Sequence, residues 1–166
     1  MIPEPCSITN PQLDIRQLAP LEVVAAAHIG PYAEMHAAFS RLAAWLDEQG
    51  QFGPDTQCLG IFHDDPEAVP AAQLRSHACF ALGEGTAAPA LPGQFEHLTI
   101  SGGPYAVLIH RGPYARLGES YRWLFQEWLP ASGHAPAEAP SFERYLNDPR
   151  DTPAEQLLTE ICLPLR

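Results

Sequence analysis

The chain has 166 residues, of which 46% are hydrophobic and 17% are charged, a composition typical of a globular domain with a buried core. Its 20 acidic and 9 basic side chains leave a net charge of −11, which repels phosphate backbones and argues against direct binding to nucleic acid. The apolar runs are too short for a membrane-spanning helix, and no basic segment precedes an apolar one near Met1. We therefore expect a cytoplasmic protein without membrane contacts.

In chain order, the pattern predicts an extended, Pro-rich arm at 1–10, followed by strands and two helices. Short runs bounded by turn residues predict strands at Leu13–Leu18, Val23–His28, Gln57–His63, His77–Leu82, Gln94–Ile100, Tyr105–His110, Ser141–Leu146 and Thr159–Leu163. Helices are predicted at Pro31–Gln49 and Pro113–Trp128. Gly83–Gly93, rich in Gly, Pro and Ala, is predicted to be a linker.

An internal repeat organises these elements. The chain reads HIGPYA from His28 and HRGPYA from His110, 82 residues later, and an amphipathic helical pattern follows each copy. The apolar positions of the two patterns are Met35, Phe39, Leu42 and Leu46, and Leu117, Tyr121, Leu124 and Trp128. Further on, Asp65-Pro66 matches Asp148-Pro149 at an offset of 83. A repeat of this length indicates one domain, 11–166, built from two fused halves, 11–83 and 94–166.

Each half therefore reads strand-strand-helix-strand-strand, which predicts an α+β fold. A helix with one apolar stripe must bury that stripe on a sheet. We expect about eight mostly antiparallel strands, two helices on one side and a pseudo-twofold axis. The other sheet face, or the seam between the halves, would then form a central cleft, which is a common place for a ligand.

The two halves differ most in their third strands. Gly60 and Phe62 of the first half correspond to Glu143 and Tyr145 of the second. Glu143 and Tyr145 share one face because side chains alternate along a strand. If Phe142 and Leu146 face the helices, Glu143 lies on the cleft face, where a carboxylate is costly unless it is paired or functional. A structural ion pair with Arg144 or Arg122 is the alternative.

Aromatic residues are the second unusual feature, because they can hold a flat, lipophilic cation by stacking and by cation–π attraction. The candidates for lining the cleft are Tyr32, Phe62, Tyr105, Tyr114, Trp123 and Tyr145. Trp123 is the strongest of them, since it lies off the apolar stripe of its helix. The residues assigned to the core are Phe39, Tyr121, Phe125 and Trp128.

The cysteines and histidines do not predict a metal site. The four cysteines, Cys6, Cys58, Cys79 and Cys162, have no CxxC spacing, so we expect buried, reduced thiols. His63, beside two aspartates, fits a turn, and His28 and His110 are predicted to cap or bridge the junction between strand and helix. No phosphate-binding loop or nucleophile motif is present, and we expect neither a cofactor nor a metal.

Several separated motifs occur in an order that resembles a known family. They are HIGPY and HRGPY, SYRWLFQEWLPASG, SFERYLNDPRDTP and LLTEICLPL. Over 11–166 the chain resembles the GyrI-like small-molecule-binding domain, the effector-binding family related to AraC- and MerR-type drug-responsive regulators and to gyrase-inhibitory proteins. The resemblance implies a duplicated architecture with a central cleft and a glutamate on a second-half strand that contacts cationic ligands. The matching residue here is Glu143.

Together these features predict a stand-alone domain that binds small, lipophilic, cationic compounds through Glu143, Tyr145, Phe62, Trp123 and Tyr105. Related regulators carry a helix-turn-helix domain upstream, whereas about ten residues precede the first strand here, so this chain, if complete, is not expected to read DNA itself. The open roles are sensor, sequestrant, or a protein inhibitor that acts on gyrase. Some stand-alone relatives are hydrolases of reactive cyclopropane compounds, which leaves a hydrolase with Glu143 and Tyr145 as catalytic residues as the alternative. Haem binding is a minor option without a defined axial ligand.

Overall fold

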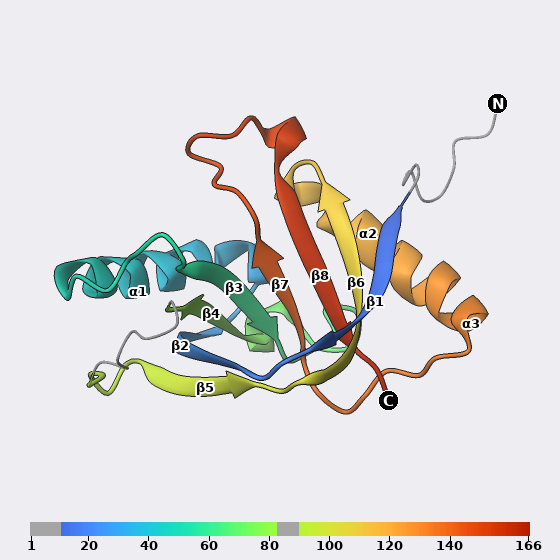
Figure 1. Cartoon of the computed structure of the whole chain (residues 1–166), viewed down its shortest axis with the longest axis horizontal. Coiled ribbons are helices and arrows are strands. Elements are labelled where there is room, and N and C mark those ends of the chain that lie inside the picture. Colours follow the sequence, from blue (N-terminus) through green and yellow to red (C-terminus); the bar gives the residue numbers. More distant parts are fainter. Residues whose placement is uncertain (1–10, 83–89) are drawn as a thin grey trace. The chain divides into compact units, whose positions relative to one another are not determined.

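The computed structural model describes residues 11–82 and 90–166, and it has the predicted α+β fold (Figure 1). The predicted arm, 1–10, and most of the predicted linker, 83–89, lie outside the described residues. The strands are β1 (Gln12–Leu18), β2 (Leu21–Ile29), β3 (Gln57–Phe62), β4 (Arg75–Ala81), β5 (Glu96–Ile100), β6 (Gly103–Arg111), β7 (Ser141–Tyr145) and β8 (Leu158–Pro164). All the predicted strands are present, with ends that differ by a few residues.

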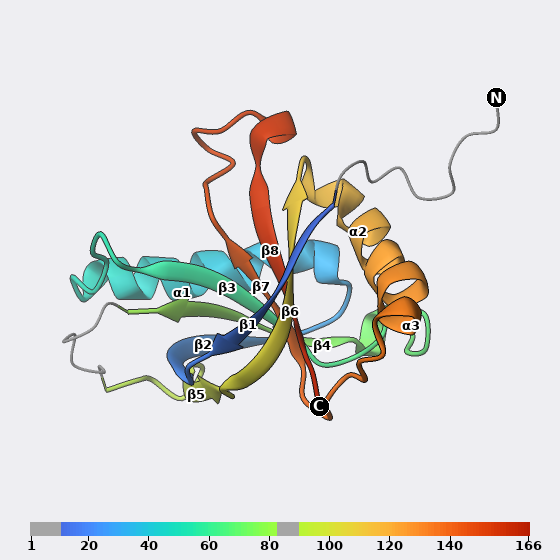
Figure 2. The same cartoon turned by 45° about the vertical axis from the view of Figure 1, so that its right-hand side comes forward.

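Two helical segments follow β2 and β6. A single 3-10 turn, Tyr32–Glu34, leads into α1 (His36–Glu48), and its counterpart, Tyr114–Arg116, leads into α2 (Leu117–Trp123). A π-helical turn, Leu124–Trp128, joins α2 to α3 (Leu129–Ser132), so that the second segment runs as one rod (Figure 2). That rod ends at Gly133, which adopts the left-handed conformation that favours glycine after a helix.

The described chain divides into two compact units. Among the described residues, the Glu143 unit contains 11–18, 103–139 and 143–166, and the Gly60 unit contains 19–82, 90–102 and 140–142. The Glu143 unit has the strand order β1-β6-β8-β7, and the Gly60 unit has the order β5-β2-β4-β3. The chain passes from the Gly60 unit into the Glu143 unit within β7.

These units differ from the two sequence halves by the exchange of one strand. β1 pairs antiparallel with β6, and β5 pairs antiparallel with β2, so each half supplies the first strand of the other unit. The exchange keeps the register, because Asp14 opposite Val107 corresponds to Glu96 opposite Ala25. Ala19-Pro20 joins β1 to β2 and lacks the glycine or asparagine that a two-residue hairpin turn favours, which is consistent with β1 not pairing with β2.

The register of the inner strands reproduces the sequence repeat. Val24 lies opposite Phe80, and the equivalent residues Ala106 and Leu163 lie opposite each other. The same hydrogen bond closes both strand-to-helix junctions, from Gly30 N to Leu74 O and from Gly112 N to Leu157 O, at 2.8 Å in each case. Both glycines have positive φ, +136° and +129°, which a side chain would strain.

Each unit has its own core, formed between its helix and its strands. In the Gly60 unit, the buried residues of this cluster are Val24, Ala26, Ala38, Leu42, Leu46, Ala78, Phe80 and Phe95. In the Glu143 unit they are Ala106, Leu108, Leu124, Ile161, Leu163 and Leu165. The predicted helical stripes therefore face their sheets. Phe125, predicted to be core, is 42% exposed because its neighbour Leu124 occupies the buried position.

The repeat generates a stability prediction. Leu42 and Leu124 are equivalent and fully buried, so Leu42→Ala and Leu124→Ala should each lower the free energy of unfolding by about 2–5 kcal/mol. Urea titration measures both values. Ile29→Thr, which alters an exposed β-branched side chain, is the control and should change stability by no more than about 0.5 kcal/mol. Similar small losses for all three variants would contradict the assignment of the two cores.

Candidate functional site

The candidate site is a buried carboxylate held by two phenols. Glu143 lies on β7 and is only 4% exposed. The Tyr121 hydroxyl, from α2, donates a hydrogen bond to Glu143 Oε2 at 2.6 Å, and the Tyr145 hydroxyl donates to Oε1 at 2.8 Å. Each carboxylate oxygen thus accepts one short hydrogen bond from a neutral donor.

Glu143 faces the helix of its unit, which corrects the predicted orientation. The prediction placed Glu143 on the face away from the helices, but its partner Tyr121 belongs to α2. The neighbouring residue Arg144 points the other way and reaches Glu160 of β8. The assumption that the residues flanking Glu143 face the helix was therefore wrong, and alternation along β7 accounts for the reversal.

The alternative of an ion pair between Glu143 and Arg144 or Arg122 is wrong, since the carboxylate accepts from two phenols instead. Arg144 Nη1 donates to Glu160 Oε1 at 3.0 Å, and Arg16 Nη1 donates to Glu160 Oε2, also at 3.0 Å. The buried carboxylate of Glu160 therefore forms ion pairs with both guanidinium groups. In the described part of the chain, the hydrogen-bond partners of Glu143 are the two phenols.

This environment changes the proton affinity of the whole cluster. Burial raises the pKa of Glu143 above its ordinary value, and the hydrogen bonds from Tyr121 and Tyr145 offset part of that rise. The pKa of the Tyr121 phenol is raised well above its ordinary value, first by burial and then by the adjacent Glu143 carboxylate. The phenols therefore remain proton donors, while Glu143 can exist in either protonation state.

The Gly60 unit carries an apolar version of the same cluster. Tyr121, Glu143 and Tyr145 correspond to Phe39, Gly60 and Phe62 by the repeat. The surrounding aromatic contact is retained, since Tyr114 packs edge-on against Tyr145 at 5.5 Å and Tyr32 packs edge-on against Phe62 at 4.9 Å. The three polar groups are therefore specific to the Glu143 unit, and the fold forms without them in the Gly60 unit.

The other predicted site residues lie in different surroundings. Tyr105 is 2% exposed and lies on the face of β6 opposite to Ala106 and Leu108, which contact the α2 core, so it does not share the face of Glu143. Trp123, predicted to lie off the apolar stripe, packs partly buried against that core. Phe62 belongs to the Gly60 unit, where it contacts Tyr32.

Sequence reasoning missed Tyr121 because it fits the apolar stripe of its helix. The repeat offered a signal, because Tyr121 corresponds to Phe39. A hydroxyl at a core position that is apolar in the other half indicates a polar partner. Ser120, which corresponds to Ala38, was also missed. Its hydroxyl lies 2.7 Å from Nδ1 of His110 and is buried.

His110 and His28 bridge their strand-to-helix junctions as predicted. Nε2 of His28 donates to the carbonyl of Pro31 at 3.0 Å, and Nε2 of His110 donates to the carbonyl of Pro113 at 3.2 Å. The two bonds occupy equivalent positions, so we regard these histidines as part of the shared scaffold.

Among residues 11–82 and 90–166, no group of three or more His, Cys, Asp or Glu side chains is arranged to hold a metal ion. Cys58, Cys79 and Cys162 are free thiols, and burial raises the pKa of Cys162 to about 12. Cys6 lies outside the described residues. Within the described ranges, no helix has the length and apolarity needed to cross a membrane.

Comparisons with known proteins identify the family of this chain. The model of a family described as the GyrI-like small molecule binding domain matches residues 11–166. A relative from Edwardsiella piscicida named DNA gyrase inhibitor is 33% identical over 161 residues, which cover 93% of this chain and 98% of the relative.

Two solved structures show the same fold. The C-terminal domain of EcmrR superposes with a TM-score of 0.75 at 17% identity, covering 95% of this chain and 99% of that domain. SAV2435, solved bound to tetraphenylphosphonium, superposes with a TM-score of 0.60 at 17% identity, covering 93% of this chain and 94% of that one. Both identities are low, so these two comparisons support the fold only.

The raised pKa of Glu143 predicts a pH dependence of stability. The folded state binds a proton more tightly than the unfolded state, whose ordinary value is 4.5, so this group contributes stability below 4.5 that is lost as pH rises through the folded pKa. The loss in wild type should be about 1.4 kcal/mol for each tenfold difference in proton affinity between the folded and unfolded states. Glu143→Gln has no carboxyl at this position and should not show this loss. Urea titrations of wild type and variant across this range measure the difference.

Tyr145→Phe supplies the complementary control. Removing one phenol takes a hydrogen bond from the ionised carboxylate, so the pKa of Glu143 should rise further and the loss of stability should extend to higher pH. A wild-type profile that coincides with that of Glu143→Gln would show that burial does not perturb Glu143.

Proposed function

This chain belongs to the family of GyrI-like small-molecule-binding domains, and we propose that it binds small, lipophilic organic cations with Glu143 as the counter-ion. Multidrug binding of this kind would suit a sensor or a sequestrant. The proposal rests on one observation above the others, the polar cluster of Tyr121, Glu143 and Tyr145, which replaces Phe39, Gly60 and Phe62 of the Gly60 unit.

Replacing the apolar cluster of the Gly60 unit by the polar cluster around Glu143 costs folding free energy, and a role in binding would explain that cost. Burying a carboxylate against two neutral phenols is less favourable than burying the phenylalanines and glycine that serve the same positions in the other unit. Arg16 and Arg144 lie in the same unit and are committed to Glu160. A cationic ligand would supply the positive charge that Glu143 lacks among the described residues.

Charge and shape both support an organic cation. A cation beside Glu143 favours the ionised carboxylate, so binding should release a proton where Glu143 is protonated in the free protein. The ring of Tyr145, whose hydroxyl binds the carboxylate, packs against the ring of Tyr114, and the pair offers aromatic surface for cation–π contact. We therefore add Tyr121 and Tyr114 to the proposed site, keep Trp123 and Phe62 as predictions, and leave out Tyr105, which lies on the other face.

A hydrolase is the second candidate, and the state of Glu143 favours it. A carboxyl whose pKa is raised by burial can take a proton from water and return it to a leaving carbon, with the Tyr145 hydroxyl orienting the reactants. An electrophilic cyclopropane is a suitable substrate, since water adds to one ring carbon, a ring bond breaks, and the proton goes to the departing carbon.

A protein partner is the third candidate, favoured by the name of the Edwardsiella piscicida relative. That protein is called a DNA gyrase inhibitor and is matched over nearly its whole length. The net charge of −11 would suit a partner surface that normally binds nucleic acid. Inhibition of gyrase would be compatible with ligand binding in the same chain.

The binding proposal predicts a selective loss of affinity. Tetraphenylphosphonium, the cation bound in SAV2435, is the probe, and triphenylphosphine oxide is its neutral aromatic counterpart. Glu143→Gln should weaken the cation about ten- to a hundredfold, since a charge-assisted contact contributes about 1.5–3 kcal/mol, and should leave the neutral compound within about twofold. Isothermal titration measures both affinities.

Glu119→Gln is the matched control, because it removes the same charge from α2 while leaving the buried cluster intact. It should bind both probes like wild type. Equal losses for the cation in Glu143→Gln and Glu119→Gln would indicate a general effect of net charge and reject the counter-ion role. Turnover of a cyclopropane electrophile beyond one product per protein, lost in Glu143→Gln only, would replace the binder with the hydrolase.

The protein-partner candidate predicts inhibition without a ligand. Purified protein should reduce supercoiling by bacterial DNA gyrase in a plasmid assay, and added salt should weaken the effect because the attraction is electrostatic. Glu143→Gln should inhibit as well as wild type, since Glu143 is buried. Unchanged supercoiling at a large molar excess of protein would rule this candidate out.

A further inference from the structure

Two histidine rings meet in the Gly60 unit, away from the cluster around Glu143. His63 follows β3 directly, and its Nε2 lies 2.8 Å from Nδ1 of His77 on β4. The ring centroids are 4.9 Å apart and the planes are inclined by 75°, so the two nitrogens approach without the rings stacking. His63 is exposed, and the His77 side chain retains 16% exposure, which leaves the pair open to solvent.

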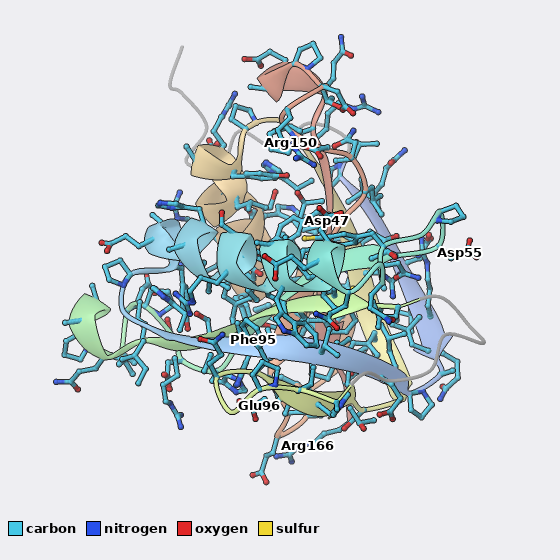
Figure 3. The ribbon with its side chains drawn as sticks, turned by 90° about the vertical axis from the view of Figure 1, so that its left-hand side faces the viewer. Asp47, Asp55, Phe95, Glu96, Arg150 and Arg166 are labelled. Atoms are coloured by element: carbon cyan, nitrogen blue, oxygen red, sulfur yellow. The ribbon has the colours of Figure 1, made fainter. Side chains whose placement is uncertain are left out.

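Glu96 determines which nitrogen of His77 is available. Nε2 of His77 donates to Glu96 Oε2 at 3.1 Å, because a carboxylate can only accept. Glu96 lies at the start of β5 (Figure 3), two strands away from His77. The cross-strand partners between them on β2 are Ala25 and Ala27, whose methyl groups leave room for the bridge. With Nε2 protonated in this way, the lone pair of neutral His77 is on Nδ1 and points toward His63.

The scaffold does not require this arrangement. The positions of His63, His77 and Glu96 correspond by the repeat to Leu146, Glu160 and Asp14 of the Glu143 unit. There, Glu160 pairs with two arginines and no imidazole is present at any of the three positions. A pair of imidazoles has therefore been placed on a fold that forms equally well without one.

We propose that His63 and His77 bind a divalent transition-metal ion, with Zn²⁺ and Cu²⁺ as the suitable ions, in place of the proton between their nitrogens. Imidazole nitrogen is a preferred ligand of both ions. Histidine ligands to metals usually donate their second ring N–H to a carboxylate, which is the relation of His77 to Glu96. Binding requires neutral His63 to carry its proton on Nδ1 in place of Nε2, an exchange through solvent with no net proton release, so that the lone pairs of His63 Nε2 and His77 Nδ1 both bind the metal.

The neighbouring charges are compatible with this site. Asp64, the residue that follows His63, forms an ion pair with Arg75 at 2.9 Å. Two protein nitrogens therefore form the site, with solvent completing the coordination, which agrees with the lack of a three-ligand cluster among the described residues.

Titration with Zn²⁺ alone, at about pH 7.5, tests the proposal in the full chain. Wild type should show one saturable equivalent, and His63→Ala and His77→Ala should both lose it. Glu96→Gln should weaken binding about ten- to a hundredfold, as expected for a carboxylate that orients a metal-bound histidine. Below about pH 6 the affinity should fall, because protons compete for the imidazoles.

His36→Ala is the control, since His36 is an exposed histidine at the start of α1 and the thiols are the same in every variant. It should bind like wild type. Electron paramagnetic resonance with one equivalent of Cu²⁺ gives a second measurement, with coupling to two imidazole nitrogens in wild type and to fewer in His63→Ala. Equal Zn²⁺ binding by all variants, or an unchanged Cu²⁺ spectrum in His63→Ala, would overturn the proposal.

Discussion

The hydrogen bonds from Tyr121 and Tyr145 to the buried carboxylate of Glu143 are the constraint on which the site depends. They require α2 to present Tyr121 toward β7, and they require β7 to turn Glu143 toward that helix. The packing of Leu124 against β6 and β8 holds the helix in place. The result is a buried carboxyl whose pKa is raised by burial and partly lowered again by the two phenols.

Two buried carboxylates of the Glu143 unit show how the same side chain is used in opposite ways. Glu160 accepts from Arg16 and Arg144, so its charge is balanced within the chain. Glu143, on the neighbouring strand but on the other face, accepts only from phenols among the described residues. Charge balance within the protein makes the first a structural group, and the missing counter-charge makes the second the better candidate for recognition.

Duplication provides an internal control that a single-copy fold lacks. Features found in both units, such as the glycine hydrogen bonds and the histidine bridges to Pro31 and Pro113, belong to the scaffold. Features found in one unit identify what has been added to it. The phenol–carboxylate cluster and the pair of imidazoles at His63 and His77 both meet that criterion, and they occur in different units.

The sequence by itself determined the duplication, the order of strands and helices and the helical stripes, and it singled out Glu143 as a candidate, because periodicity and repeated motifs are local properties of the chain. Tertiary structure decided the remaining features. It exchanged β1 and β5 between the halves, since strand pairing depends on contacts distant in sequence. It turned Glu143 toward α2 and made Tyr121 its partner, although Tyr121 fitted an apolar stripe. In a short strand such as β7, either set of alternating side chains can face the helix. Contacts with residues distant in sequence decide between the two sets, and these contacts exist only in the folded chain.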